Sequence, residues 1–341
     1  MENQLNHFKL FSNCVLVKGV CKSLILDLQF HKYFEIENEL YNVLQKNIEN
    51  SFTIIELKKQ FKYQYDEGID SFFNYFKEKN LGFFTDEPRI FPKLKIQWDS
   101  PFKITNAVIE FSNFSKYDLI DLIYQLENLG CTAIELRFKD EISLEVLENI
   151  LIKTELSRII AFFIFIKDFE ALNIGDLSNL KQKYPRVAEF IVHSCKVNKE
   201  VYSKDKLFNL SFIRFTGNIL NSKSELKNKR SFVINIESYS EARNYNLGLN
   251  RKVSINEFSE IKNYISHEKV YGNLEKNKIS EIISTIEFQV KWGISKDKIE
   301  ICKDCQFKYS CVDNSDIIKK NNKFFKVESC NYNPIKNIWF H

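Results

Sequence analysis

Four of the eight cysteines of this chain lie close to its C-terminal end, where their spacing reads C-x2-C-x5-C-x18-C. They are Cys302, Cys305, Cys311 and Cys330. The C-x2-C step lets two sulfurs converge on one metal across a tight turn. Four thiolates complete the ligand set of one zinc ion or one [4Fe-4S] cluster, so these residues are the candidate metal ligands.

The spacing of the last two cysteines distinguishes the two kinds of centre. A zinc knuckle usually pairs two C-x2-C hooks, whereas eighteen residues separate Cys311 from Cys330. The pattern therefore favours one [4Fe-4S] cluster, and one zinc ion is the alternative. The remaining cysteines are scattered, which argues against a disulfide framework and predicts a reducing, cytoplasmic compartment. They are Cys14, Cys21, Cys131 and Cys195.

Composition argues against several classes of function. A net charge of +4 is mild for 341 residues and predicts no nucleic-acid partner. The longest apolar run, Ile159–Ile166, is far shorter than the ~20 residues of a membrane span, and the first residues lack the pattern of a signal peptide. The 9 glycines are too dispersed to form a phosphate-binding loop, which excludes a P-loop or a dinucleotide fingerprint.

The first segment, residues 1–95, reads as a small module that ends at a proline-rich linker with Pro88, Pro92 and Pro101. Two short strands flank Gly19 as a hairpin, three helical patterns follow, and a final strand is predicted as a wing. Thr53 and Glu56 form a capping box at the second helix. This is the order of a winged-helix module. The predicted elements are Cys14–Val17, Ser23–Leu28, Glu37–Asn47, Thr53–Lys62, Glu67–Asn80 and Leu81–Thr85.

The second segment, residues 96–240, alternates strands and helices, which predicts an α/β fold with parallel strands. Its strands form either an open sheet or a partial barrel. The predicted strands are Ile104–Phe111, Thr132–Phe138, Ile159–Ile166, Ala188–His193, Leu210–Phe215 and Phe232–Ile236, and the helices are Tyr117–Leu129 and Leu144–Lys153. The third segment, residues 241–341, has one amphipathic helix, Ser280–Trp292, and then the cysteines.

The cysteine region resembles a known family. The run Lys303–Asp313, followed by Cys330–Pro334, resembles the SPASM domain of radical-SAM peptide maturases. It is most similar to the SPASM-domain peptide maturases of grasp-with-spasm systems, which act beside an ATP-grasp ligase on ribosomally synthesised and post-translationally modified peptides. The likeness extends through Asn250–Lys252, Glu260–Asn263 and Gly272–Leu274. It implies a winged-helix-like N-terminal module, a degenerate partial (β/α)6 radical-SAM-like barrel and a C-terminal SPASM domain.

The chain departs from that family at two places. A full SPASM domain holds two clusters and has a further cysteine where Ser315 stands, and this chain has no cysteine between Cys195 and Cys302, so one cluster site remains. The radical-SAM motif C-x3-C-x2-C is replaced by Ser112–Tyr117, and the Gly-Gly-Glu motif by Arg137–Glu141. We therefore expect no independent radical-SAM activity and assign no catalytic residue.

The resemblance also implies a role for the first module. Many such maturases begin with a PqqD-like module that recognises the leader of a precursor peptide by β-augmentation, in which the peptide adds a strand to an exposed sheet edge. The expected edge lies near Phe30–Ile36, and the third helix would present phenylalanines to the peptide. The alternative is that the phenylalanines only form core. The candidate peptide-binding residues are Phe30, Tyr33, Phe34, Ile36, Phe72, Phe73 and Phe76.

Together these patterns predict a cytoplasmic accessory maturation protein. It would bind the leader of a precursor peptide and present that peptide to an ATP-grasp ligase, with no membrane or nucleic-acid partner. Four protein ligands leave no open position on a cluster, so the centre would be structural. One alternative is an iron–sulfur redox enzyme or electron-transfer protein that acts on a peptide. Another is a zinc-stabilised interaction scaffold, and a third is a catalyst that uses an undetected barrel pocket.

Overall fold

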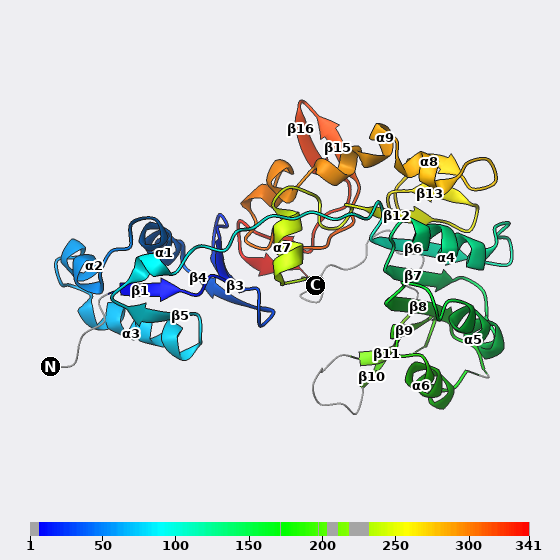
Figure 1. Ribbon diagram of the computed structural model, residues 1–341, viewed down its shortest axis with the longest axis horizontal. Coiled ribbons are helices and arrows are strands. Elements are labelled where there is room, and N and C mark those ends of the chain that lie inside the picture. The colour runs from blue at the N-terminus through cyan, green and yellow to red at the C-terminus, as the bar shows by residue number, and fades with distance from the viewer. Residues whose placement is uncertain (1–6, 171, 197, 203–210, 218–231, 341) are drawn as a thin grey trace.

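The computed structural model describes residues 7–170, 172–196, 198–202, 211–217 and 232–340. Three parts follow one another along its long axis (Figure 1). The N-terminal module lies at one end and a large sheet at the other. The part of the chain that holds Cys302, Cys305, Cys311 and Cys330, here called the cysteine segment, lies between them. The spatial order therefore differs from the order along the chain. Within the described residues, no helix has the length and apolar character needed to cross a membrane.

The N-terminal module contains two small antiparallel sheets. The hairpin predicted around Gly19 is confirmed: β2 (Cys14–Val17) pairs with β3 (Ser23–Asp27), which pairs in turn with β4 (Lys32–Ile36). The second sheet joins β1 (His7–Leu10) to β5 (Gly82–Thr85). The predicted final strand therefore exists, but its partner is β1, which the sequence pattern did not indicate, and not the hairpin.

Three helices complete the N-terminal module, and the first of them packs on one face of the three-stranded sheet. They are α1 (Asn38–Asn50), α2 (Ile54–Gln60) and α3 (Asp66–Glu78). The predicted capping box at α2 is confirmed, because the Glu56 N–H donates to Thr53 Oγ1 over 3.0 Å and the Thr53 N–H donates to the Glu56 carboxylate over 2.8 Å. The helices bury a core that includes Ile25, Leu44 and Phe73. The opposite face of the sheet is covered by another part of the chain, described below.

The large sheet has nine strands in the order β10-β11-β9-β8-β7-β6-β12-β13-β14, and it is open because β10 and β14 form its two ends. Six neighbouring strands run parallel, and the three outer strands each pair antiparallel with a neighbour, so the fold is mixed α/β with a mostly parallel sheet. The parallel strands are β6 (Asn106–Phe111), β7 (Ala133–Phe138), β8 (Ala161–Lys167), β9 (Val187–His193), β11 (Ser211–Phe215) and β12 (Lys252–Ile255). The outer strands are β10 (Lys199–Tyr202) on one side and β13 (Glu260–Lys262) and β14 (Gly272–Asn273) on the other.

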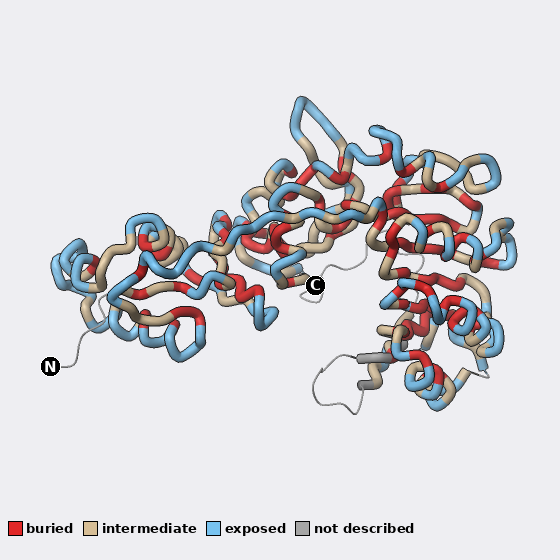
Figure 2. The backbone as a smooth tube through the Cα atoms, in the orientation of Figure 1, coloured by how far each residue is buried: buried red, intermediate tan, exposed pale blue. Residues whose placement is uncertain are grey.

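Helices α4 (Leu119–Asn128), α5 (Leu144–Lys153) and α6 (Ile174–Lys183) connect successive strands from β6 to β9. Right-handed crossovers that proceed in one direction along a sheet place their helices on the same face, as Figure 1 shows. Side chains of alternate strand residues, such as Ile109, Leu136 and Ile164, join the core beneath these helices. In Figure 2 many residues of the large sheet are coloured as buried, whereas the linker is exposed along most of its length.

The C-terminal segment contributes the last three strands of this sheet, since β12 pairs in parallel with β6. The predicted strand Phe232–Ile236 is wrong: Phe232 forms a single bridge with Cys311, and helix α7 (Ile236–Ala242) begins where the strand was expected to end. Asn235 causes this start, because its side chain accepts the Ser238 N–H and caps the helix. Of the predicted strand Leu210–Phe215, Leu210 lies outside the described residues and the rest forms β11.

The predicted helix Ser280–Trp292 is also wrong as one element. It is divided into α8 (Ile279–Ile283), α9 (Ile286–Gln289) and the 3-10 helix η3 (Val290–Gly293). Thr285 explains the interruption, since its hydroxyl accepts the Phe288 N–H and starts a new helix. The chain ends in short elements, namely η4 (Lys296–Lys298), η5 (Cys302–Asp304), β15 (Ile317–Lys320), β16 (Lys323–Lys326), β17 (Tyr332–Asn333) and β18 (Ile338–Trp339).

Candidate functional site

The four predicted metal ligands lie in one neighbourhood of the C-terminal segment. Cys302 begins η5, and the Cys305 N–H donates to the Cys302 carbonyl over 3.0 Å, which closes the C-x2-C turn. Burial raises the pKa of the Cys305 thiol, and the nearby Cys311, Cys302 and Cys330 raise it further. None of the eight cysteines forms a disulfide. The fold therefore brings the four thiols close enough to influence one another.

The donor types fit a thiolate-bound metal, although the thiols do not form a closed coordination sphere. Within the part of the chain that the structure describes, no group of three or more His, Cys, Asp or Glu side chains is placed to hold a metal ion. The Phe307 N–H donates to Cys305 Sγ over 3.4 Å, and the Tyr332 N–H donates to Cys330 Sγ over 3.5 Å. Such backbone hydrogen bonds orient ligand sulfurs and tune clusters. Both the presence of a metal at these cysteines and its nature stay predictions.

Two lysines, the buried Lys296 and the half-buried Lys326, provide positive charge beside the thiols. The Lys296 ammonium lies 3.7 Å from the Asp313 carboxylate, and Lys326 pairs with the same carboxylate. Burial raises the pKa of Cys302 to about 11, whereas Lys296 and Lys326 act in the opposite direction. A metal or cluster held by four thiolates carries a net negative charge, and buried cations offset such a charge. The surroundings are therefore suited to an anionic centre.

Asp313 also engages Ser315, the residue that stands where a full SPASM domain has a further cysteine. The Ser315 N–H and hydroxyl both donate to Asp313 Oδ1, over 3.0 and 2.6 Å. Gly248 packs so closely on this loop that an added Cβ would lie 2.1 Å from the Asp313 carbonyl oxygen. In this chain, that position therefore supports the Asp313 carboxylate, which in turn holds Lys296 and Lys326.

The cysteine segment packs on the face of the β2–β3–β4 sheet that the helices leave open. Leu24 and Leu26 of β3 join Phe307, Tyr309 and Tyr332 in one buried cluster, which Cys305 and Cys330 border. Aromatic rings dominate this contact. The Phe307 ring stacks on Phe232 with centroids 4.3 Å apart, and it meets the Tyr33 ring edge-on at 5.5 Å. The N-terminal module and the candidate metal centre therefore share a core, which the sequence pattern did not reveal.

The β2–β3 turn contacts the C-x2-C turn directly. The Val20 N–H donates to the Asp304 carbonyl over 2.8 Å, and an added Cβ on Gly19 would lie 2.9 Å from Cβ of Gln306. Asn38, the first residue of α1, holds the same turn by donating its amide to the Val20 carbonyl over 3.0 Å. A change in the conformation of the cysteine loop would therefore reach the start of α1.

The residues predicted to bind a peptide occupy different environments. Phe30 is 56% exposed, Phe34 and Phe72 are half-buried, and Ile36 is buried. Tyr33 contacts Phe307 of the cysteine segment, as described above. Phe73 and Phe76 are each 1% exposed and pack against Phe8, so both serve as core in this conformation. Among the described strands, β4 pairs only with β3, so no strand pairs with its other edge.

The face of the large sheet away from α4–α6 carries buried charges that the sequence analysis missed. Glu110 of β6 and Arg137 of β7 are neighbours in register, and they are 3% and 5% exposed. The Arg137 guanidinium donates to the Tyr264 hydroxyl over 3.0 Å and lies over the Phe165 ring at 5.2 Å. Burial raises the pKa of Glu110, against the effect of Lys139, which lies 3.5 Å away. Charged residues at alternate positions of apolar strands were the available signal.

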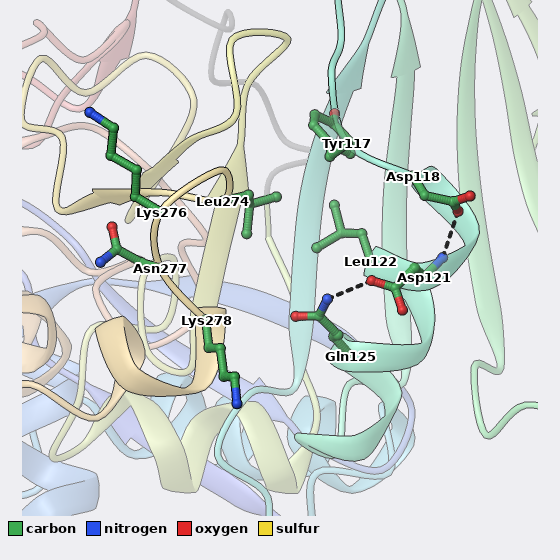
Figure 3. Close-up of a pocket in the computed structure, with 9 residues that line it drawn as sticks. All are labelled: Tyr117, Asp118, Asp121, Leu122, Gln125, Leu274, Lys276, Asn277 and Lys278. Carbon is green, nitrogen blue, oxygen red and sulfur yellow. Dashed lines mark hydrogen bonds between the residues drawn. The ribbon is translucent and has the colours of Figure 1, made fainter.

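A cavity of about 360 Å³ lies between the start of α4 and residues 274–278 (Figure 3). Leu122 and Leu274 face each other across it. Its acidic groups already serve α4, because Asp118 Oδ1 accepts the Asp121 N–H over 2.8 Å and Asp121 Oδ2 accepts the Gln125 amide over 2.7 Å. Those hydrogen bonds leave fewer acceptor positions for a ligand, so we assign no function to this cavity.

Comparisons of the chain with known protein families, with curated proteins and with solved structures return no match.

Proposed function

We propose that this chain is an accessory protein of ribosomal-peptide maturation. It binds the leader of a precursor peptide through its N-terminal module and presents the peptide to an ATP-grasp ligase, which resides on another chain. The observation that supports this proposal most directly is the edge of β4 with which no described strand pairs, beside the exposed Phe30. A winged-helix-like or PqqD-like module that ends its sheet in this way is suited to β-augmentation.

The leader would add a strand next to β4. Main-chain hydrogen bonds supply affinity in this mode, and side chains at alternate positions supply specificity. Phe30 lies just before β4 and exposes much of its ring, so it is the residue best placed to contact the leader through its side chain. Phe73 and Phe76 would support the module from its core.

The cysteine centre would fix the geometry of this module. Cys302, Cys305, Cys311 and Cys330 would hold one [4Fe-4S] cluster or, alternatively, one zinc ion in a SPASM-like domain. Bound there, the metal would supply a covalent cross-link between the cysteine loop and the segment around Cys330. Because the cysteine loop contacts the β2–β3 turn through Val20 and Asp304, that cross-link would support the sheet that receives the peptide.

The experiment uses a phage-displayed library of random dodecapeptides as the probe, with the full chain immobilised. The proposal predicts enrichment of peptides that bind in an extended conformation. Synthetic copies of these peptides should slow amide hydrogen exchange in β4. Phe30→Ala should weaken their binding about tenfold, whereas Tyr63→Ala, which removes a similarly exposed aromatic ring elsewhere, should not. Protection confined to another element, or equal effects of both substitutions, would overturn the assignment.

A further inference from the structure

A second cavity, of about 460 Å³, lies where the linker reaches the large sheet. Its walls come from Lys103 at the end of the linker, from Tyr245 and Arg251 before β12, and from Trp292 and Gly293 of η3. This volume falls within the range of ligand-binding pockets, roughly 300–1,000 Å³. Neither the resemblance nor the proposed function assigns a role to it.

Among the described residues that line the cavity, the charged ones are Lys103 and Arg251, and none is a carboxylate. Within the described ranges neither cation forms an ion pair. Arg251 is nevertheless fixed in place: its guanidinium donates to the Phe102 carbonyl and lies over the Trp98 ring at 5.4 Å. The Trp98 ring packs in turn on Tyr245, with centroids 5.1 Å apart. None of these contacts neutralises the charge of Arg251; the nearby acidic group is Glu241, whose pKa Arg251 lowers.

Trp292 adds an unused hydrogen-bond donor. The residue is 8% exposed, and its buried indole N–H has no hydrogen-bond partner in the described structure. Its position is set by an edge-on contact with Phe288 at 5.8 Å and by the Asn246 N–H, which donates to the Trp292 carbonyl over 2.8 Å. A buried donor without a partner typically costs about 1–3 kcal/mol. Because this nitrogen is itself buried, an acceptor oxygen in the cavity would reach it only after a shift of the Trp292 ring, and that contact would remove the cost.

We propose that this cavity binds a carboxylate group of an acidic peptide segment. A guanidinium and a neutral N–H donor suit a planar, singly charged acceptor, and Lys103 adds long-range attraction. The carboxylate chemistry rests on the cavity alone. The identification of the occupant as a segment of the precursor peptide rests on the proposed function, in which that peptide is presented to an ATP-grasp ligase.

The experiment titrates the full chain with the acetylated and amidated peptide Gly-Glu-Gly-Glu-Gly and records the indole N–H resonance of Trp292. The two other tryptophans, Trp98 and Trp339, are distinguished by Trp→Phe substitution. The proposal predicts a saturable shift of the Trp292 resonance. The matched peptide Gly-Gln-Gly-Gln-Gly should bind at least tenfold more weakly, because it cannot supply a carboxylate. Equal binding of both peptides, or an unmoved Trp292 resonance, would overturn the proposal.

Two variants test the location of the site. A Cβ on Gly293 would meet open space, so Gly293→Phe should fill the cavity without disturbing the fold and abolish the titration. Gly68→Phe is its control, since that glycine also has open space around it and lies in the N-terminal module. Lys103→Glu should weaken binding about tenfold, whereas Lys95→Glu, an exposed lysine of the same linker, should not. Unchanged binding in Gly293→Phe contradicts the location.

Inorganic phosphate serves as a competing probe. The proposal predicts that phosphate displaces the Glu peptide only at concentrations well above those of acetate, and the reverse order would contradict a carboxylate site. The Glu peptide carries no leader. Failure of leader binding at β4 would therefore leave this titration intact, and failure of the titration would leave leader binding intact.

Discussion

The backbone N–H of Val20 donates a hydrogen bond to the carbonyl oxygen of Asp304 over 2.8 Å. Val20 lies in the turn of the first hairpin, and Asp304 lies between two of the candidate metal ligands, Cys302 and Cys305. This contact joins the beginning of the chain to its cysteine loop. The peptide-binding sheet and the metal centre of the proposed function are therefore parts of one packed unit.

The centre can be tested by removing one ligand. Cys311→Ser should abolish stoichiometric metal content and lower the melting temperature by about 10 °C, because structural metal binding contributes to folding free energy. Cys195→Ser is the control, since Cys195 is also half-buried but lies outside the cluster of four. Metal analysis and thermal unfolding measure both effects. A metal-free Cys311→Ser protein of unchanged stability would favour the redox alternative.

The contact between the hairpin and the cysteine loop can be tested at Gly19. An added Cβ would lie 2.3 Å from the Lys22 carbonyl oxygen and 2.9 Å from Gln306, so Gly19→Ala should lower the free energy of unfolding by about 2 kcal/mol or more. Gly68→Ala should instead raise it by up to about 1 kcal/mol, because Gly68 lies in α3 with open space around it. Urea unfolding distinguishes these outcomes. Similar behaviour of the two variants contradicts a close contact.

The raised pKa of the Glu241 carboxyl should make the free energy of unfolding depend on pH. Burial raises its pKa from 4.5 to about 7, against a hydrogen bond from Asn250. The folded state then binds the proton more tightly than the unfolded state, so the free energy of unfolding falls as the pH rises from about 4.5 to about 7. Glu241→Gln should be more stable than the native protein at pH values above this range, by up to about 3 kcal/mol, and should lack this slope.

Denaturant unfolding at several pH values measures the difference between the two proteins. A Glu241→Gln variant whose stability follows the same pH profile as the native protein would show that another group titrates. The nearby charges that contribute to the shift are Glu237, Arg251 and Lys252.

The backbone conformation of Ile301 indicates local strain immediately before the candidate metal ligands. Its φ of 69° and ψ of −47° are unusual for a β-branched residue, and the side chain is 59% exposed. Ile301→Gly should therefore be neutral or stabilising by about 1 kcal/mol. The control Ile335→Gly, at an exposed isoleucine without positive φ, should destabilise by about 1 kcal/mol. Thermal unfolding compares them, and equal losses would argue against strain at Ile301.

Local features of this fold were predictable because their signals lie within a few residues. The hairpin around Gly19, the capping box at Thr53 and the alternation of strands and helices from β6 to β9 were all expected. Pairings between distant segments were not, since no local pattern indicates that β1 meets β5 or that β12 meets β6. The break at Thr285 was missed because its capping signal lies inside an apolar periodicity typical of one helix.

The same contrast between local signals and contacts of distant segments applies to the candidate sites. The cysteine spacing identified four thiols that lie near enough to influence one another, although the described residues form no coordination sphere. Spacing could not show that Lys296 and Lys326 surround them, since those contacts depend on packing. The unpaired indole of Trp292 and the buried pair Glu110 and Arg137 are likewise products of tertiary structure.

Iron, zinc and acid-labile sulfide analysis of the anaerobically purified full chain tests the central claim most directly. The account predicts about four irons and four sulfides per chain, with broad absorption near ~400 nm. One zinc per chain without sulfide would keep the four-cysteine centre and replace the cluster. A folded protein with neither metal, in which an alkylating reagent modifies Cys302, Cys305, Cys311 and Cys330 without loss of stability, would contradict the existence of the centre.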